Sequence, residues 1–245
     1  MWDDPRRLDL MSLALAGVAT LMLAAGGVAW LVRQSWCDIH EVVVTTPLAR
    51  ASGVQIEAVI RDFKGTFFTL DLSDAQSALR AVPWVRSVGL RRQWPGRLAI
   101  DIEEHVPLAR WNDNALVDTR GEVFTATYAG DLPRFDGPDG RSALMTQQYA
   151  TWTAMLAPLS LSIGTLKLSS RGGWEIAAAG KRGPLAIEVG RDEADERIAR
   201  FVGVYPRTIG ALERAGASVA RVDLRYRNGF AARASDLPAS PARKT

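Results

Sequence analysis

One apolar run, residues 10–32, constrains this 245-residue chain more than any other feature of its sequence. The run contains no charged residue, and apart from Trp30 its only polar side chains are Ser12 and Thr20. At 1.5 Å per residue, about 23 residues of α-helix reach about 34 Å, which is enough to cross the hydrocarbon core of a bilayer. We therefore predict a transmembrane helix over residues 10–32, preceded by a short tail over residues 1–9.

The charges beside the run predict its orientation. Arg6, Arg7 and the α-amino group precede it, whereas Arg33 alone follows closely behind it. The more basic flank of a span stays in the cytoplasm, so the tail is expected to be cytoplasmic and the bulk of the chain to be exported. A cleaved signal peptide remains an open alternative, because Gly27-Val28-Ala29 fits a small-x-small cleavage site.

Composition argues against several function classes. The formal net charge is only +3, which predicts no nucleic-acid partner. The two histidines, His40 and His105, have no metal-ligand spacing, and the single cysteine, Cys37, cannot form an internal disulfide. The sequence has no phosphate-binding glycine loop and no G-x-S-x-G nucleophile elbow. We therefore predict a non-enzymatic protein with no catalytic residue, metal, cofactor or small-molecule substrate.

Residues 37–105 follow a β-α-α-β-β pattern. Residues 39–45 are β-branched and predict a strand. Ser52 and Ser73 each begin an S-x-x-Q pattern, which predicts the start of a helix that the serine caps. Residues 85–91 and 98–104 predict a hairpin. This order predicts two helices on one face of a three-stranded sheet whose first strand and one hairpin strand lie at the edges.

Residues 106–230 predict a mostly antiparallel β domain with flanking helices, so the fold class of the whole chain is α+β. Expected strands lie within 116–124, at 166–168, 174–178 and 186–189, and at 218–226, with helices at 145–157 and 192–205. The acidic residues at the start of the second helix suit the helix dipole.

The last predicted strand and the tail that follows it indicate where a partner could bind. Residues 231–245 are Ala, Arg, Ser and Pro without periodicity, which predicts a disordered tail. With no later strand to cover it, the strand over 218–226 is expected at a sheet edge, where its free backbone groups could pair with a partner strand. The alternative is that this strand lies inside the sheet or at an edge that solvent alone covers.

An ordered series of motifs resembles the FtsQ/DivIB family of bacterial cell-division proteins. Examples are Arg92-Gln-Trp-Pro-Gly-Arg-Leu and Val222-Asp-Leu-Arg-Tyr-Arg-Asn-Gly. Further matching stretches are 65–72, 82–85, 103–112, 116–124, 132–140 and 200–206. The resemblance covers nearly the whole chain and implies that residues 37–105 are a POTRA domain, a module linked in the family to recruitment to the division site.

The resemblance also implies partners. FtsQ proteins bind FtsB and FtsL in the inner membrane and thereby link early and late division proteins at the septum. In this chain the FtsB contact would fall on Arg171, Asp223, Leu224, Arg225, Tyr226, Asn228, Gly229 and Phe230. Tyr226 would be an aromatic anchor, and Arg171 and Arg225 would pair with acidic side chains of FtsB.

The resemblance has one departure and leaves one alternative function. Family members can carry a tryptophan a few residues past the tyrosine, where this chain has Ala231-Ala232-Arg233-Ala234, so Phe230 is a candidate substitute. The alternative is a membrane-anchored periplasmic enzyme acting on the cell wall. An outer-membrane transport protein is excluded, because the chain is too short for a downstream barrel.

Overall fold

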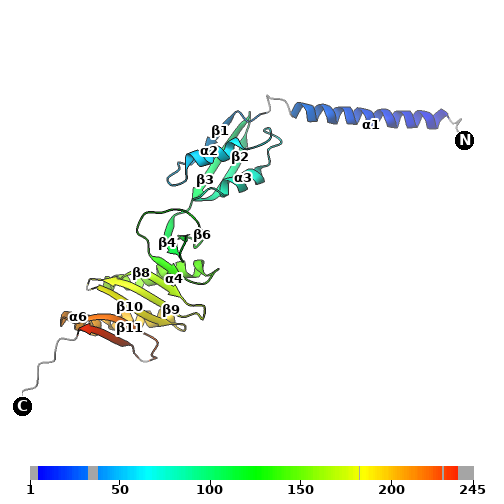
Figure 1. Cartoon of the computed structure of the whole chain (residues 1–245). Helices are drawn as coiled ribbons and strands as arrows, with labels where there is room; N and C mark the ends of the chain where they lie inside the picture. The colour runs from blue at the N-terminus through cyan, green and yellow to red at the C-terminus, as the bar shows by residue number, and fades with distance from the viewer. Residues whose placement is uncertain (1–4, 33–37, 182, 228, 237–245) are drawn as a thin grey trace, which may run out of the picture. The chain divides into compact units, whose positions relative to one another are not determined.

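The computed structural model describes residues 5–32, 38–181, 183–227 and 229–236 (Figure 1). It comprises two units, Met1–Glu104 and His105–Thr245, and each is described by itself. The predicted fold class is confirmed: an apolar N-terminal helix, a β-α-α-β-β domain and a β-rich domain follow one another.

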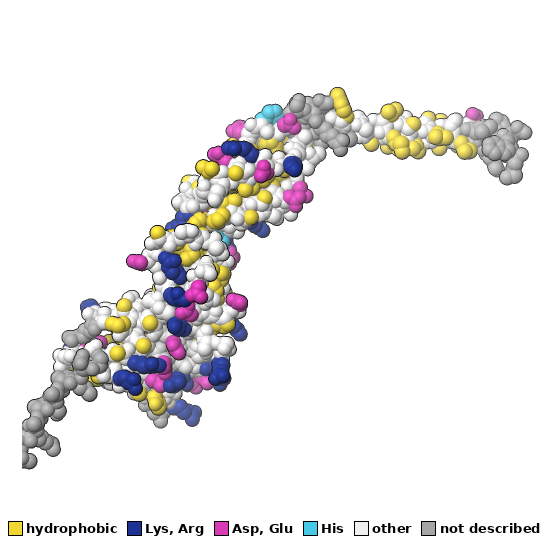
Figure 2. Space-filling view, in the orientation of Figure 1, with side chains coloured by type: hydrophobic (Ala, Val, Ile, Leu, Met, Phe, Trp, Pro, Cys, Tyr) yellow, Lys and Arg dark blue, Asp and Glu magenta, His cyan; other side chains and the backbone are white. Residues whose placement is uncertain are grey.

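The N-terminal helix α1 (Pro5–Val32) has the length and surface that a bilayer requires. Its segment Met11–Val28 qualifies as a membrane span, and none of that segment is buried in the protein. Leu13, Leu21 and Leu23 are each more than 70% exposed, and hydrophobic side chains are visible along the surface of this helix (Figure 2). A helix that is apolar all round and covered by no protein is the expected form of a transmembrane helix. Arg33 and Cys37 lie outside the described residues.

The first unit contains a three-stranded sheet in the order β1-β3-β2. Its elements are β1 (Glu41–Val44), α2 (Gly53–Arg61), α3 (Leu72–Arg80), β2 (Val85–Gln93) and β3 (Arg97–Glu104). The central strand β3 pairs parallel with β1 and antiparallel with β2, and both helices cover one face of the sheet (Figure 1). The predicted topology and the predicted edge strands are therefore confirmed.

The helix caps differ from the predicted serine caps. Helix α3 begins two residues earlier than expected, and its cap is Asp71, whose carboxylate accepts hydrogen bonds from the backbone N–H groups of Ser73 (2.8 Å) and Asp74 (3.3 Å). An ionised carboxylate both accepts these bonds and suits the positive end of the helix dipole, so it outcompetes the serine. Ser52 does occupy the N-cap position of α2, but its side chain makes no capping hydrogen bond.

The core of this unit lies between β3 and the two helices. Leu98 and Ile100 of β3, Ile56 of α2 and Leu79 of α3 are at most 1% exposed. The apolar period of each element therefore decides which face it buries.

The tip of the β2–β3 hairpin is held against the chain that enters β1. The backbone N–H of His40 donates to the carbonyl oxygen of Gly96 at 2.8 Å. Gly96 has φ +64°, and a Cβ atom there would lie 2.7 Å from His40 Nδ1 and 2.9 Å from the carbonyl oxygen of Asp38. Only glycine combines this backbone conformation with so close an approach.

Substituting Gly96 by alanine is therefore expected to destabilise the first unit by at least about 1–2 kcal/mol, the cost of a left-handed residue before any displacement of His40. Gly53→Ala is the matched control, because a Cβ at Gly53 meets no atom within 4 Å. Urea denaturation of the full chain in detergent measures both. Equal stability of the two variants would contradict the close contact at Gly96.

The second unit is built on a nine-stranded sheet in the order β12-β11-β10-β9-β8-β7-β4-β5-β6. Its strands are β4 (Pro107–Trp111), β5 (Ala115–Asp118), β6 (Val123–Phe124), β7 (Arg134–Asp136), β8 (Ser162–Leu168), β9 (Trp174–Gly180), β10 (Gly183–Gly190), β11 (Ser218–Asp223) and β12 (Ala231–Asp236). Its α-helices are α4 (Ser142–Leu156), α5 (Ala194–Val204) and α6 (Ile209–Arg214). Neighbours run antiparallel except in the pairs β4–β7, β7–β8 and β10–β11.

Helices α4 and α5 pack on this sheet and on each other. Helix α4 contacts β8, and α5 contacts β10. Trp152 of α4 and Phe201 of α5 are at most 1% exposed, and the Trp152 ring meets the Trp174 ring of β9 edge to face at 5.0 Å between centroids. This helical layer supports the strands that carry the site described below.

The prediction of a disordered tail from residue 231 is wrong for its first six residues. Ala231–Asp236 form β12, which pairs antiparallel with β11. The strand exists because its backbone completes hydrogen bonds with β11, and this pairing needs no hydrophobic period of its own. The rest of the predicted tail, residues 237–245, lies outside the described residues.

Candidate functional site

The edge of the large sheet is β12, not the strand that the sequence predicted. Strand β11 lies between β10 and β12, so the internal position left open for residues 218–226 is correct. Within the part of the chain that the structure describes, no strand pairs with the outer side of β12. Such an edge presents unpaired N–H and C=O groups to a partner strand.

Charged side chains gather beside this edge. The guanidinium of Arg225 donates hydrogen bonds to the carboxylate of Asp223, from Nε to Oδ1 at 2.9 Å and from Nη2 to Oδ2 at 2.7 Å. The same Nη2 lies 3.1 Å from Oε2 of Glu188 on β10, and Arg221 of β11 forms an ion pair with Glu188. Together with Arg233 of β12, these side chains line a surface hollow of about 360 Å³.

These contacts set the ionisation of the site. The hydrogen bonds from Arg225 hold the pKa of Asp223 below its usual value, and they outweigh the opposite effect of burial. The same bonds raise the pKa of Arg225 above its usual value. The Arg225–Asp223 pair is therefore stabilised in its ionised form. The hollow is lined by three guanidinium groups and two carboxylates.

Arg171 joins this site from a distant part of the sequence. It lies in the turn before β9, and it lines a second hollow of about 330 Å³ with Arg225, Glu188, Glu175 and Arg191. Arg171 and Arg225, the two residues expected to pair with acidic side chains of FtsB, thus line one hollow. Strand β9 is not the direct neighbour of β11, however, because β10 lies between them.

The other predicted contact residues divide into exposed and buried ones. Tyr226 is 57% exposed, and a Cβ atom at Gly229 would have no atom within 4 Å. Leu224 is only 3% exposed, and Phe230 is half-buried with its ring edge to face against Phe201 at 5.7 Å. Leu224 and Phe230 thus pack against the core of this unit, and neither is as exposed as Tyr226. Asn228 lies outside the described residues.

Three charged residues around Arg225 were not predicted from the sequence: Arg221, Glu188 and Arg233. Arg221 alternates along β11 with the predicted Asp223 and so shares a face with it, a signal that the sequence did contain. Glu188 lies opposite Asp223 in the parallel β10–β11 register, which no local pattern reveals. Arg233 lies opposite Arg221 on a strand that was not predicted.

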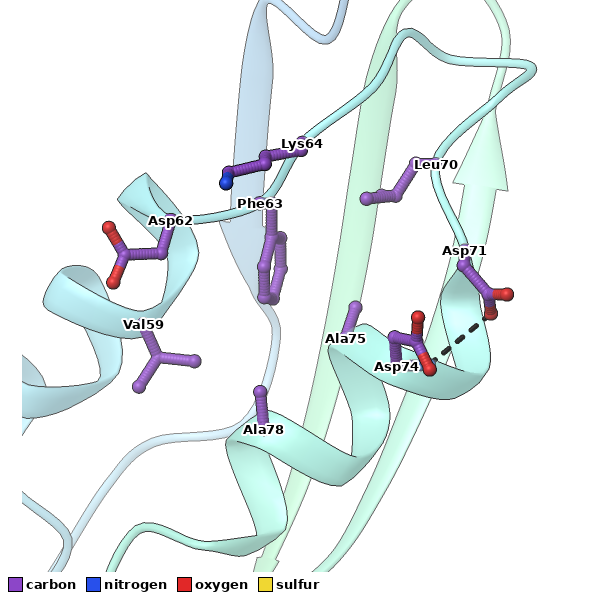
Figure 3. A pocket seen from close by; sticks show the side chains of 9 residues that line it. All are labelled: Val59, Asp62, Phe63, Lys64, Leu70, Asp71, Asp74, Ala75 and Ala78. Atoms are coloured by element: carbon purple, nitrogen blue, oxygen red, sulfur yellow. Dashed lines mark hydrogen bonds between the residues drawn. The ribbon is translucent and has the colours of Figure 1, made fainter.

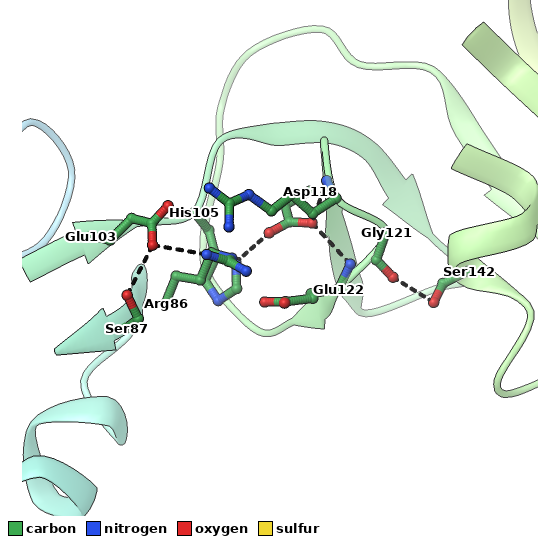
Figure 4. Close-up of polar contacts among 9 residues, drawn as sticks. Arg86, Ser87, Glu103, His105, Asp118, Gly121, Glu122 and Ser142 are labelled. Carbon is green, nitrogen blue, oxygen red and sulfur yellow. Dashed lines mark hydrogen bonds and ion pairs between the residues drawn. The ribbon is translucent and has the colours of Figure 1, made fainter. Parts of the chain in front are cut away.

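A second polar cluster lies in the β4–β5–β6 region (Figure 4). His105 and Asp118, both buried, approach at 2.8 Å between Nδ1 and Oδ2, and the His105 ring stacks on Phe124. The other carboxylate oxygen of Asp118 accepts from the backbone N–H groups of Arg120 (2.9 Å) and Glu122 (2.8 Å). Metal-ligating atoms of His105, Asp118 and Glu122 lie within 4.8 Å of one another. Because turn hydrogen bonds and the histidine already engage Asp118, the arrangement is that of a structural turn.

Burial acts to raise the pKa of Asp118, but the hydrogen bonds from His105, Glu122 and Arg120 outweigh it and hold the pKa below its usual value. A carboxyl group with a depressed folded pKa stabilises the fold above its unfolded pKa, and this stabilisation is lost as the pH falls through the folded value. Asp118→Asn is expected to cost about 1–3 kcal/mol at neutral pH, because it leaves polar partners unpaired.

This cost should shrink as the pH falls below the usual pKa of an unfolded aspartate, about 3.9, toward the lower value of the folded state. Denaturation at several pH values measures it, with Asp113→Asn as the control, since the Asp113 side chain is 83% exposed. A cost for Asp118→Asn that stays constant down to acidic pH would contradict the assignment.

In the first unit, a groove lies between α2 and α3 (Figure 3). Val59, Phe63 and Leu70 supply apolar lining, and Asp62 and Asp74 lie at its rim. The basic residues of the hairpin have partners of their own: Arg97 pairs with Glu41 (2.7 Å), Arg91 with Asp101 (3.7 Å), and Arg92 donates to the Leu70 carbonyl oxygen.

Comparison with known proteins identifies both units. Residues 39–105 match the model of the FtsQ-type POTRA domain, and residues 109–225 match that of the cell division protein FtsQ/DivIB C-terminal domain. The chain is 35% identical over 260 residues to the cell division protein FtsQ of Bordetella pertussis, covering 97% of this chain and 94% of the relative. It is 34% identical over 242 residues to that of Burkholderia pseudomallei, covering 97% and 96%.

The FtsQ of Escherichia coli is 30% identical over 235 residues, covering 92% of this chain and 84% of the relative. The similarity extends over both units and covers at least 84% of each of these relatives. The chain therefore belongs to the FtsQ family of cell division proteins.

Proposed function

We propose that this protein assembles the division machinery of the bacterial inner membrane by binding FtsB, and with it FtsL, along the edge strand β12. In this proposal α1 spans the inner membrane, the tail over residues 1–9 is cytoplasmic, and both folded units lie in the periplasm at the septum. The observation that carries the proposal is the free outer edge of β12 beside a cluster of arginines.

The edge supplies affinity and the side chains supply specificity. A partner segment that adds to β12 gains main-chain hydrogen bonds along the whole strand. Arg233 of β12 and Arg171 form no ion pair with any described residue, so their guanidinium groups are available to carboxylates of the partner. Tyr226, which precedes β12, is an exposed aromatic of the kind that anchors interfaces. An acidic strand is therefore the partner that this edge fits.

The membrane span contributes to binding without adding a contact. Partners that are themselves anchored in the same bilayer meet this edge at a higher effective concentration than they would in solution. The span is thus part of the binding mechanism in this proposal.

Co-expression of the full chain with full-length FtsB and FtsL, followed by size exclusion in detergent, tests the assignment. One peak that contains all three proteins is expected, and separate elution would contradict the partner assignment. Depletion of the protein should give filamentous, undivided cells, because septa then fail to assemble. If the purified chain instead cleaved peptidoglycan, the alternative of a cell-wall enzyme would hold.

A further inference from the structure

An aromatic cluster lies at one end of the POTRA domain. Phe67, Phe68 and Trp94 pack together, with ring centroids of Phe67 at 5.2 Å from Phe68 and 5.9 Å from Trp94. Phe67 is buried at 7% exposure, whereas Phe68 is 51% exposed and Trp94 is 65% exposed. Large aromatic side chains that are exposed next to one another form an apolar patch of the kind that marks an interaction surface.

The chain itself limits how far this cluster can lie from the membrane. Trp94 belongs to the hairpin tip, and Gly96 of that tip accepts a hydrogen bond from the backbone N–H of His40. Helix α1 ends at Val32, so eight residue steps separate the end of the span from the anchoring point at His40. At no more than about 3.6 Å per residue, the tip lies within about 29 Å of the end of the span.

The opposite end of the domain is farther along the chain and differently built. There the backbone N–H groups of Ala49, Arg50 and Ala51 donate to the carboxylate of Glu104, at the far end of β3. The eight residues of β3 separate the two ends by about 26 Å at 3.3 Å per residue. The exposed aromatics therefore lie at the end of the domain to which the membrane span is tethered.

The chemistry of this tip suits the headgroup region of a bilayer. Tryptophan is enriched at membrane interfaces, where its ring is partly in lipid and its N–H meets water. Lys64, three residues before Phe67, is exposed and can meet a lipid phosphate. Arg92 is exposed but also donates to the Leu70 carbonyl oxygen, and the acidic Glu41 is paired with Arg97 at 2.7 Å. A bilayer surface satisfies both the aromatic and the basic groups.

We propose that Phe68 and Trp94 dock the POTRA domain onto the outer surface of the same bilayer that α1 spans. This inference rests on the proposed membrane insertion of α1. Docking would hold the domain against the membrane and restrict the directions in which the rest of the chain can extend.

Nitroxide depth measurements on the full chain in nanodiscs of phosphatidylethanolamine and phosphatidylglycerol test the proposal. In a Cys37→Ser background, single labels are placed by Gln93→Cys at the tip, by Val54→Cys at the opposite end of the domain, and by Leu21→Cys in the middle of α1. Val54 is the matched exposed apolar site, at 77% exposure. The label at 93 is expected to collide severalfold less with an aqueous nickel chelate, and more with oxygen, than the label at 54.

Replacing both Phe68 and Trp94 by serine should return the label at 93 to the aqueous accessibility of the label at 54. Val54→Ser should leave the accessibility of the label at 93 unchanged. In the variant that lacks both Phe68 and Trp94, an unaltered spectrum of a label at position 54 reports that the domain stays folded. Suppose that the label at 21 lies in lipid while the label at 93 is as accessible to the nickel chelate as the label at 54. This outcome refutes docking but leaves the insertion of α1 intact.

Two further outcomes also overturn the proposal. A label at 21 that is accessible to the chelate refutes the insertion of α1, and docking with it. Protection of the label at 93 that appears only in nanodiscs holding two chains would assign the cluster to contact with a second copy.

Discussion

The Tyr226→Ala variant is expected to lose its binding to FtsB while its own fold stays intact. Tyr226 is 57% exposed, so truncation of its ring removes little that the fold needs. Aromatic anchors at the centre of an interface cost at least about 2 kcal/mol when truncated, which is roughly a 30-fold rise in Kd. Titration calorimetry with the full chain and the soluble segment of FtsB in detergent measures the change.

Val123→Ala is the control for this variant. Val123 is 46% exposed on β6, the strand at the other edge of the same sheet. Truncation there should leave the Kd unchanged, because the proposed interface follows β12. Loss of binding in both variants, or in neither, would contradict the assignment to the β12 edge.

Gly229→Glu probes the same interface by charge. A side chain at Gly229 has open space around it, so the fold accommodates the glutamate. A negative charge there should repel an acidic partner, whereas Gly229→Ala should bind as the parent chain does. Equal binding of the Glu and Ala variants would show that the partner does not pass this position.

Local sequence patterns predicted the helices and strands that have a clear hydrophobic period. They failed for elements that form only by pairing or packing with a segment elsewhere in the chain. The helix expected at 192–205 is α5, and Ile198 and Phe201 face the core as its period requires. The short helix α6 was not predicted, because it has six residues and buries only Ile209. Strand β12 is alanine-rich and is a strand only because β11 lies beside it.

The site could be predicted only in the part that local sequence encodes. Arg225 and Tyr226 follow a recognisable strand, so their place near a sheet edge was within reach of the sequence. The ion pairs with Glu188 depend on the parallel register of β10 and β11, and the approach of His105 to Asp118 depends on how β4 and β5 pair. Register is a property of two segments together, so neither segment alone reveals it.

Trp152→Ala is expected to destabilise the second unit by about 3–5 kcal/mol, which is a large part of the 5–15 kcal/mol that stabilises a typical domain. Trp152 is fully buried, meets Trp174 edge to face, and donates from Nε1 to Oδ1 of Asp195 at 2.7 Å. Alanine therefore leaves a cavity and removes a hydrogen bond at once. Thermal unfolding of the full chain in detergent measures the loss.

Trp152→Phe separates the loss of fold from the loss of binding. Phenylalanine keeps most of the buried ring and loses only the bond to Asp195, so we expect a cost of about 1–2 kcal/mol. Because α4 supports the sheet from a position remote from β12, this variant should remain folded and bind FtsB with the Kd of the parent chain. A weakened Kd at unchanged helix content would show that the helical layer takes part in binding, and the interface would then extend beyond the β12 edge.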